Sequence, residues 1–224
     1  KKYKPDFSSV FLNAGAHIQH HYFFNMVGKS YLNPEWYIDK NLDPSLDLFK
    51  VYDKILFDHL NLQKDYDLLI LTGLSQSPCP KPKYYYRLKN HKNFLNKFKI
   101  NFKKVLPRMT RDYTLVFENN IRAKEAEEKL NKFTSLDKKK LFGVIDNRGD
   151  SLFVTLTHSD EIKKTDKFLY DGEIIDIFND IVFVAIKNGI HDQNGYLFTS
   201  MKTEKKEKIH IMDSFSLIKN YFKI

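Results

Sequence analysis

The sequence predicts an α/β protein in which a mainly parallel sheet is flanked by helices and interrupted by an inserted α+β subdomain. Short continuous apolar runs alternate with amphipathic segments of helical period, as in strand–helix–strand units. Between residues 87 and 172 this pattern changes to separate strands, helices and a hairpin. A chain of 224 residues that is 42% hydrophobic can hold one large domain with such an insertion. The predicted core therefore comprises residues 1–86 and 173–224, and the insertion comprises residues 87–172.

Three short apolar runs predict the strands of the parallel sheet, at residues 8–12, 66–71 and 181–186. Three segments with apolar residues at helical spacing predict the flanking helices, at residues 16–27, 43–62 and 213–221. Asp43 is an N-cap followed by Pro44 at the first helical position, and Asp213 is a similar aspartate cap. Polar segments after the second and third strands predict loops at one edge of the sheet, at residues 72–78 and 187–196.

The insertion has a β-α-β-β pattern that can pack as a subdomain of its own. A helix, a strand, a second helix and a hairpin are predicted at residues 90–98, 113–118, 121–133 and 141–157. Asp146, Asn147 and Gly149 are typical hairpin-turn residues, so the turn is expected there.

The charge balance raises the possibility of a nucleic-acid partner but does not favour it. The formal net charge is +9, which matches the electrostatic footprint of a nucleic-acid-binding domain. The lysines are scattered, however, and the clusters at Lys138–Lys140 and Lys202–Lys208 fall where solvated loops are expected. A basic nucleic-acid-binding domain is therefore the least favoured of three functional classes.

Other features of the composition concern the compartment. The chain has no run of about eighteen apolar residues and no charged-then-apolar leader, which predicts neither a membrane segment nor a signal peptide. Cys79 is the single cysteine and cannot form an internal disulfide. These observations predict a cytoplasmic protein.

Histidines predict a metal site. His17, His20 and His21 follow the first predicted strand, and their i, i+3, i+4 spacing places them on one helical face. His191 follows the third predicted strand. Because neutral imidazole binds zinc well, these four histidines predict a nitrogen-ligand site for one divalent cation. The alternative is a structural role, in which His20 or His21 caps the core and His17 is solvated.

Two arginines of the insertion predict an anion site. Arg108 and Arg111 can clamp an anionic substrate, since guanidinium groups bind phosphate and carboxylate in a forked geometry. The alternative is an ion pair with Asp112 or Glu118.

The order of these motifs resembles the alkaline phosphatase superfamily, particularly its phosphodiesterase and nucleotide pyrophosphatase-like members. The segment from Pro5 to His20 is similar to the family's strand with an aspartate-x-x-x-histidine metal pair, and Gly189-Ile190-His191 resembles its late glycine-x-histidine motif. The resemblance covers roughly residues 5–80 and 180–222. It implies an alkaline phosphatase-like α/β core that is incomplete at its amino terminus, because the family's nucleophile lies further upstream.

The resemblance implies a metal-dependent hydrolase or transferase that acts on a phosphate, phosphodiester or sulfate ester. It assigns no catalytic nucleophile within this chain. Ala16 or Asn13 stands where the family has an aspartate, and Thr72-Gly73-Leu74-Ser75 stands where it has further ligands. These departures support the alternative of a catalytically inactive domain that binds a nucleotide or sugar phosphate.

Overall fold

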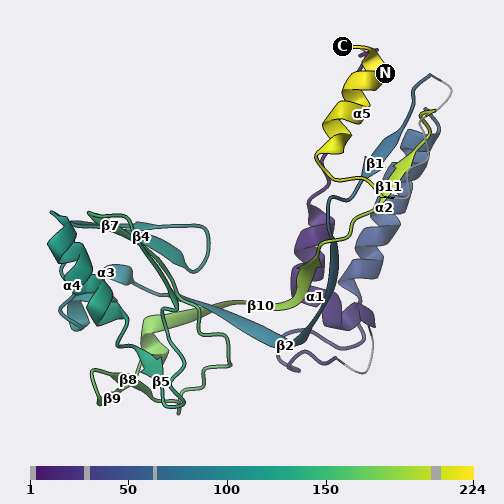
Figure 1. Ribbon diagram of the computed structural model, residues 1–224. Coiled ribbons are helices and arrows are strands. Elements are labelled where there is room, and N and C mark those ends of the chain that lie inside the picture. Colours follow the sequence, from purple (N-terminus) through teal and green to yellow (C-terminus); the bar gives the residue numbers. More distant parts are fainter. Residues whose placement is uncertain (1–3, 28–30, 63–64, 203–207) are drawn as a thin grey trace. The chain divides into compact units, whose positions relative to one another are not determined.

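The chain divides into two compact units, which we describe separately (Figure 1). Unit 1 consists of residues 1–78 and 189–224, and unit 2 of residues 79–188. The computed structural model describes residues 4–27, 31–62, 65–202 and 208–224. Most of the Lys202–Lys208 cluster therefore lies outside the described residues. No helix within the described ranges is long and apolar enough to cross a lipid bilayer.

In its described residues, unit 1 contains three helices and a two-stranded sheet. The helices are α1 (Ala14–Val27), α2 (Pro44–Leu60) and α5 (Asp213–Phe222). The strands β1 (Leu69–Leu71) and β11 (Leu197–Thr199) pair antiparallel. Helices α1 and α2 pack on each other, and the backbone amide of Gly15 donates a 2.6 Å hydrogen bond to the hydroxyl of Tyr52.

The three helices predicted for this part of the chain are confirmed. An Asp43 carboxylate oxygen accepts a 2.9 Å hydrogen bond from the amide of Leu46, so α2 begins at the predicted cap. The predicted aspartate cap of α5 is wrong, because Asp213 lies one position inside the helix and Met212 is the N-cap. The Asp213 carboxylate instead accepts a hydrogen bond from the amide of His210.

Unit 2 is built on a four-stranded antiparallel sheet with strand order β3-β4-β7-β6. Its strands are β3 (Lys104–Pro107), β4 (Asp112–Val116), β6 (Val144–Asn147) and β7 (Ser151–Thr155). Helix α3 (His91–Lys97) contacts β3, and α4 (Asn120–Leu130) contacts β6 and β7. The predicted hairpin is confirmed: β6 pairs with β7, and Gly149 at the turn has a φ of +89°.

A second, three-stranded sheet and two long strands complete the described structure. The small sheet contains β5 (Thr134–Ser135), β8 (Phe168–Tyr170) and β9 (Glu173–Ile175). The long strands β2 (Ser75–Leu88) and β10 (Ile181–Asp192) pair with one another, and each runs from one unit into the other. The short 3₁₀ helix η1 (Phe178–Asp180) precedes β10.

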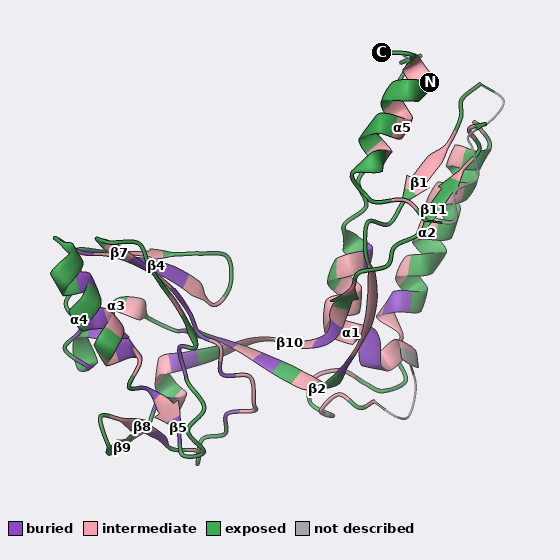
Figure 2. Ribbon diagram, in the orientation of Figure 1, coloured by how far each residue is buried: buried purple, intermediate pink, exposed green. Residues whose placement is uncertain are grey.

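The core of unit 2 is aromatic. Phe133 is fully buried, and its ring lies within 6 Å of four other aromatic rings. These are the rings of Phe94, Phe98, Phe142 and Tyr170. Buried residues are concentrated on the sheet of unit 2 and on the faces of α3 and α4 that contact it (Figure 2).

The prediction of a mainly parallel sheet is wrong. The strand pairs with a recorded register are all antiparallel, and a 2.8 Å hydrogen bond from the Lys89 amide to the Asp180 carbonyl joins the end of β2 to the start of β10, as in an antiparallel pair. Residues 8–12 form no strand, and the Phe11 side chain is 88% exposed. The described residues therefore contain no alkaline phosphatase-like α/β core.

The other two predicted strands form, but with partners that the prediction did not foresee. The run at 66–71 contributes only β1, which pairs with β11, and the run at 181–186 belongs to β10, which pairs with β2. The predicted loops at 72–78 and 187–196 are partly strand, because β2 begins at Ser75 and β10 extends to Asp192. A short apolar run indicates burial, but it does not determine the direction of the neighbouring strand.

Candidate functional site

Two of the predicted metal ligands meet in unit 1. His20 lies on α1 and His191 near the end of β10, and their Nε2 atoms are 2.9 Å apart. The ring centroids are 4.6 Å apart, with the ring planes tilted by 39°. His191 is exposed and His20 is partly buried, so the pair is accessible from solvent. We call these two residues the His20–His191 pair.

The carbonyl of Gly189 determines which nitrogen of His20 faces its partner. His20 Nδ1 lies 3.1 Å from this carbonyl oxygen, so a proton on Nδ1 gives a hydrogen bond to the backbone. In that tautomer the lone pair of Nε2 points toward His191. A histidine that ligates a metal usually donates its other ring N–H to a carbonyl or carboxylate in this way.

Glycine is required at position 189 by the close approach of β10 to α1. A Cβ atom at this position would lie 2.3 Å from the carbonyl oxygen of Gln19, which no side chain can tolerate. The amide nitrogen of Gln76 donates a 3.0 Å hydrogen bond to the carbonyl of Ala16, so β2 is also attached to α1. The site therefore depends on Gly189 and Gln76 as well as on the histidines.

His17 and His21 form a separate contact on α1. Their ring centroids lie 4.9 Å apart, as expected for side chains at i and i+4. Among the described residues, no group of three or more His, Cys, Asp or Glu side chains is placed to hold a metal ion. The four predicted ligands are thus arranged as two pairs, and only one pair joins segments distant in sequence.

The two Nε2 atoms of the His20–His191 pair are at hydrogen-bond distance, so one imidazole donates its N–H to the other; a divalent cation with two protein ligands could take the place of that proton. Two nitrogens bound to a tetrahedral zinc ion at about 2.0–2.1 Å are about 3.3 Å apart. The observed separation of 2.9 Å needs to widen by only a few tenths of an ångström, which is within reach of a side chain at the solvent-exposed end of the site. The other ligand positions would fall to water or substrate, because no carboxylate completes a group of three in the described part of the chain.

The two predicted substrate-binding arginines lie in unit 2 and have different surroundings. Arg108 lines a cavity, and its Nε atom donates a 3.3 Å hydrogen bond to the hydroxyl of Thr114. The guanidinium carbon of Arg111 lies 4.0 Å from the centre of the Tyr85 ring, a cation–π contact. Burial raises the pKa of Tyr85 above its usual value, and the positive charge of Arg111 opposes part of this shift.

Neither arginine forms the ion pair that was the alternative to anion binding. The ion pairs among the described residues include no contact from Arg108 or Arg111 to Asp112 or Glu118. The Asp112 carboxylate instead accepts a 2.7 Å hydrogen bond from the hydroxyl of Thr155 on the neighbouring strand.

Sequence reasoning missed three residues that matter for these sites. Arg87, Lys89 and His91 line the same cavity as Arg108, but they come from a strand end and a helix start with no recognisable motif. The charged–apolar–charged order of Arg87, Leu88 and Lys89 was the available signal, because side chains alternate between the two faces of a strand.

Comparison of the chain with protein-family models, with curated proteins and with solved structures finds no match.

Proposed function

We propose that the chain binds one divalent cation through His20 and His191. The cation is zinc, because imidazole nitrogen is a ligand that zinc prefers. With this cation the chain acts as a metal-dependent hydrolase or transferase on a phosphate, phosphodiester or sulfate ester. The observation that supports this proposal is the 2.9 Å approach of the two Nε2 atoms. The choice of substrate class follows from the chemistry of such a cation, which would polarise a phosphoryl or sulfuryl oxygen.

The roles of the residues follow from their contacts. The carbonyl of Gly189 holds His20 with its Nε2 lone pair toward His191, so one ligand is oriented before the cation arrives. His191 is exposed, so its ring would have room to adjust to the cation. A divalent cation held there polarises a phosphoryl or sulfuryl oxygen and lowers the pKa of a bound water molecule.

A catalytically inactive domain that binds a nucleotide or sugar phosphate is the second candidate function. It is favoured by the residues around the pair, because Ala16 stands four positions before His20 and supplies no carboxylate. A ligand that binds equally well with and without a divalent cation would select this candidate.

Zinc titration of the 224-residue chain, measured by competition with a chromophoric chelator, tests the metal site. We expect saturable binding of one zinc ion, and a loss of about tenfold or more in affinity for His20→Ala and for His191→Ala. His17→Ala is the matched control, because His17 lies on the same helix and contacts His21 instead. The control should bind zinc like the natural chain.

Assays with aryl phosphate, phosphodiester and sulfate esters test the reaction. We expect zinc-dependent hydrolysis that falls with the same two substitutions. Zinc binding without hydrolysis of any of the three would remove the enzymatic proposal and leave the metal site. A natural chain that binds no zinc, or that loses zinc equally with His17→Ala, would remove both.

A further inference from the structure

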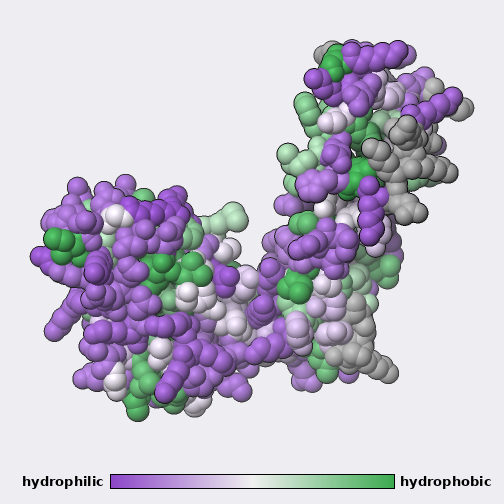
Figure 3. Space-filling model, viewed as in Figure 1, coloured by the Kyte–Doolittle hydropathy of each residue, from purple (hydrophilic) through white to green (hydrophobic). Residues whose placement is uncertain are grey.

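Unit 2 carries most of the positive charge of the chain. Residues 79–188 include 23 Lys and Arg against 15 Asp and Glu, a net charge of +8 out of the total of +9. The visible surface of this unit is predominantly hydrophilic (Figure 3).

Cations gather at a cavity of about 390 Å³ between the end of β2, the start of α3 and the β3–β4 hairpin. Its polar lining includes Arg87, Lys89, His91, Arg108, Thr110 and Asp112. We call it the Arg87–Arg108 cavity. Three permanent cations thus face one carboxylate, and that carboxylate already accepts a hydrogen bond from Thr155.

The local structure explains why the cations converge. Arg87 and Lys89 are two residues apart on either side of Leu88, which is 3% exposed, so both side chains lie on the face opposite the core. Arg108 comes from the β3–β4 hairpin, where its backbone amide donates a 2.8 Å hydrogen bond to the carbonyl of Asp112. The bond from its Nε atom to Thr114 holds the guanidinium group in place.

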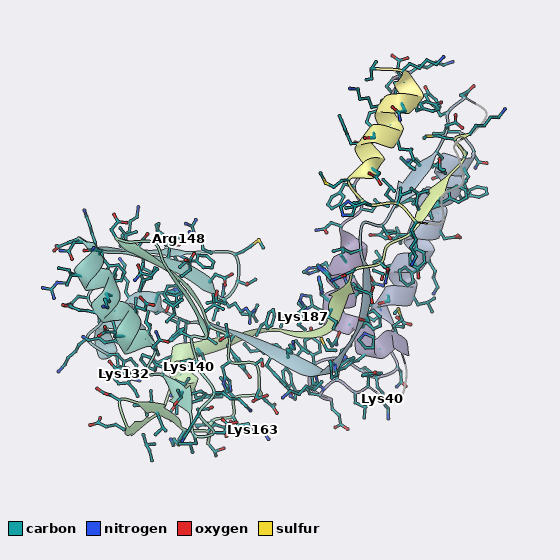
Figure 4. The ribbon with its side chains drawn as sticks, in the orientation of Figure 1. Lys40, Lys132, Lys140, Arg148, Lys163 and Lys187 are labelled. Carbon is teal, nitrogen blue, oxygen red and sulfur yellow. The ribbon has the colours of Figure 1, made fainter. Side chains whose placement is uncertain are left out.

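Some basic residues of unit 2 have a carboxylate partner, whereas the three cations of this cavity are in no ion pair with a described residue and line the same depression. Lys132 pairs with Asp171 at 2.9 Å, and Arg148 pairs with Asp146 at 2.8 Å (Figure 4 labels the two basic residues). Among the described residues, no ion pair reaches Arg87, Lys89 or Arg108. Cations that outnumber the carboxylates around one cavity favour the binding of an anion.

The lowered pKa of His91 reflects burial and also a positive electrostatic potential in the cavity. Burial lowers the pKa of His91, and the nearby Arg87 lowers it further. The ring rests against the fully buried Tyr113, with the centroids 4.8 Å apart. The positive field that acts on His91 is the same field that would attract an anion.

We propose that Arg87, Lys89 and Arg108 bind the phosphate group of a small phosphoester in the Arg87–Arg108 cavity. Phosphate matches the forked donors of arginine, and the hydroxyl of Thr110 can donate to a further oxygen. The volume is within the range of small-ligand sites. The proposal is independent of the His20–His191 pair, because its residues all lie in unit 2 and need no metal ion.

The cavity suits a small phosphoester better than a nucleic acid. Single-stranded nucleic acid is bound by a basic groove together with aromatic side chains on which bases stack. Among the described residues, no aromatic side chain other than the imidazole of His91 lines this cavity, and the adjacent Tyr113 is only 1% exposed. A nucleic acid would therefore find phosphate ligands here but no stacking surface.

Isothermal titration of the 224-residue chain with inorganic phosphate and with adenosine monophosphate tests the proposal, in EDTA and a phosphate-free buffer. We expect saturable binding of one ligand per chain. Arg87→Gln and Arg108→Gln should each weaken it by about ten- to a hundredfold, as for the loss of charge-assisted hydrogen bonds. Arg148→Gln removes the same charge outside the cavity and should change the affinity by less than about twofold.

Further variants keep the result interpretable. Arg108→Lys keeps the charge but loses the forked geometry, so we expect an affinity between those of the natural chain and Arg108→Gln. Circular dichroism and melting temperature show whether each variant folds. If either Arg87→Gln or Arg108→Gln does not fold, the affinity of the other variant tests the proposal. The absence of saturable binding to the natural chain would overturn the proposal, as would an equal loss with Arg148→Gln.

A single-stranded oligonucleotide of about twelve nucleotides is the last probe. If it binds much more tightly than adenosine monophosphate and is weakened equally by Arg87→Gln, Arg108→Gln and Arg148→Gln, the unit is a diffuse nucleic-acid surface and the proposal is wrong. We expect instead that the oligonucleotide gains little over the mononucleotide.

Discussion

His20 differs from its neighbours on α1 because it contacts β10 through both of its ring nitrogens. One nitrogen faces the carbonyl of Gly189 and the other faces His191. His17 and His21 contact each other on the same helix. Residues with equivalent sequence spacing therefore differ in their surroundings, because His20 contacts a segment distant in the chain whereas His17 and His21 contact each other.

Another histidine, His158 in unit 2, is a buried titratable group. Its side chain is packed against Phe168, with ring centroids 5.3 Å apart, and only 6% of the residue is exposed. Burial lowers its pKa below 6.5; the carboxylates of Asp160, Asp137 and Asp166 oppose this shift, and Lys139 adds to it.

We predict that the stability of unit 2 depends on His158 at mildly acidic pH. The unfolded chain takes up a proton near the ordinary histidine pKa, whereas the folded chain does so only at a lower pH. The free energy of unfolding therefore falls as the pH drops below about 6.5, and the loss is complete below the folded pKa. His91, whose pKa is also lowered, contributes in the same direction.

Urea denaturation at about pH 8 and about pH 5 measures this dependence. His158→Leu should lose less stability between the two pH values than the natural chain, while remaining folded at the higher pH. If both chains lose the same free energy of unfolding between the two pH values, the pKa of His158 does not differ between the folded and the unfolded chain.

At the residue scale, the sequence predicted which residue types would form sites better than it predicted their grouping. The i, i+3, i+4 spacing correctly placed three histidines on one helix, but it did not show that only His20 meets His191. That contact depends on the path of β10 over α1, which is set by Gly189 and has no local signal. Arg108 was predicted as an anion ligand and lines a cavity, whereas Arg87 lines the same cavity and was not predicted, because it belongs to a strand without a motif.

At the scale of elements, helices were predicted well and strands poorly. The helix α2 begins at Asp43 and Pro44 because capping and helical spacing are properties of neighbouring residues. A strand needs a partner that can lie anywhere in the chain. The run at 66–71 therefore predicted a strand correctly and its parallel neighbour wrongly.

We predict that the Asp43 cap stabilises α2 and the α1–α2 packing. Asp43→Ala removes the acceptor for the Leu46 amide and should lower the free energy of unfolding by about 1 kcal/mol. Asp43→Asn keeps an oxygen acceptor and should recover most of this loss. Thermal denaturation followed by circular dichroism measures both, and equal melting temperatures for the natural chain and the alanine variant would contradict the prediction.

At the scale of the whole molecule, the two units bury their apolar residues to different extents. Unit 2 has an aromatic core around Phe133, whereas unit 1 leaves large apolar side chains exposed, among them Phe11, Phe57 and Phe215. Its sheet has only two short strands, and such pairs are marginally stable alone. Unit 2 is therefore expected to hold the slowest-exchanging backbone amides of the chain.

We predict that Phe133→Ala destabilises unit 2 by about 3–5 kcal/mol, because it leaves a cavity among four packed aromatic rings. Leu136→Ala is the control, since Leu136 is 58% exposed and its truncation should cost less than about 0.5 kcal/mol. Hydrogen exchange of the amides in β4 and β7 reports the change directly. Equal protection in the two variants would show that Phe133 is not central to the core.

The close approach at Gly189 also bears on how this protein can vary in evolution. A Cβ at this position would collide with a backbone oxygen, which cannot rotate away as a side chain can. A substitution of either histidine changes a side chain and places no new atom against the backbone oxygen of Gln19. Among homologues that retain this junction of β10 with α1, we therefore expect glycine at position 189 to vary less than either histidine. Position 189 would then be the better marker for tracing the site through diverged sequences.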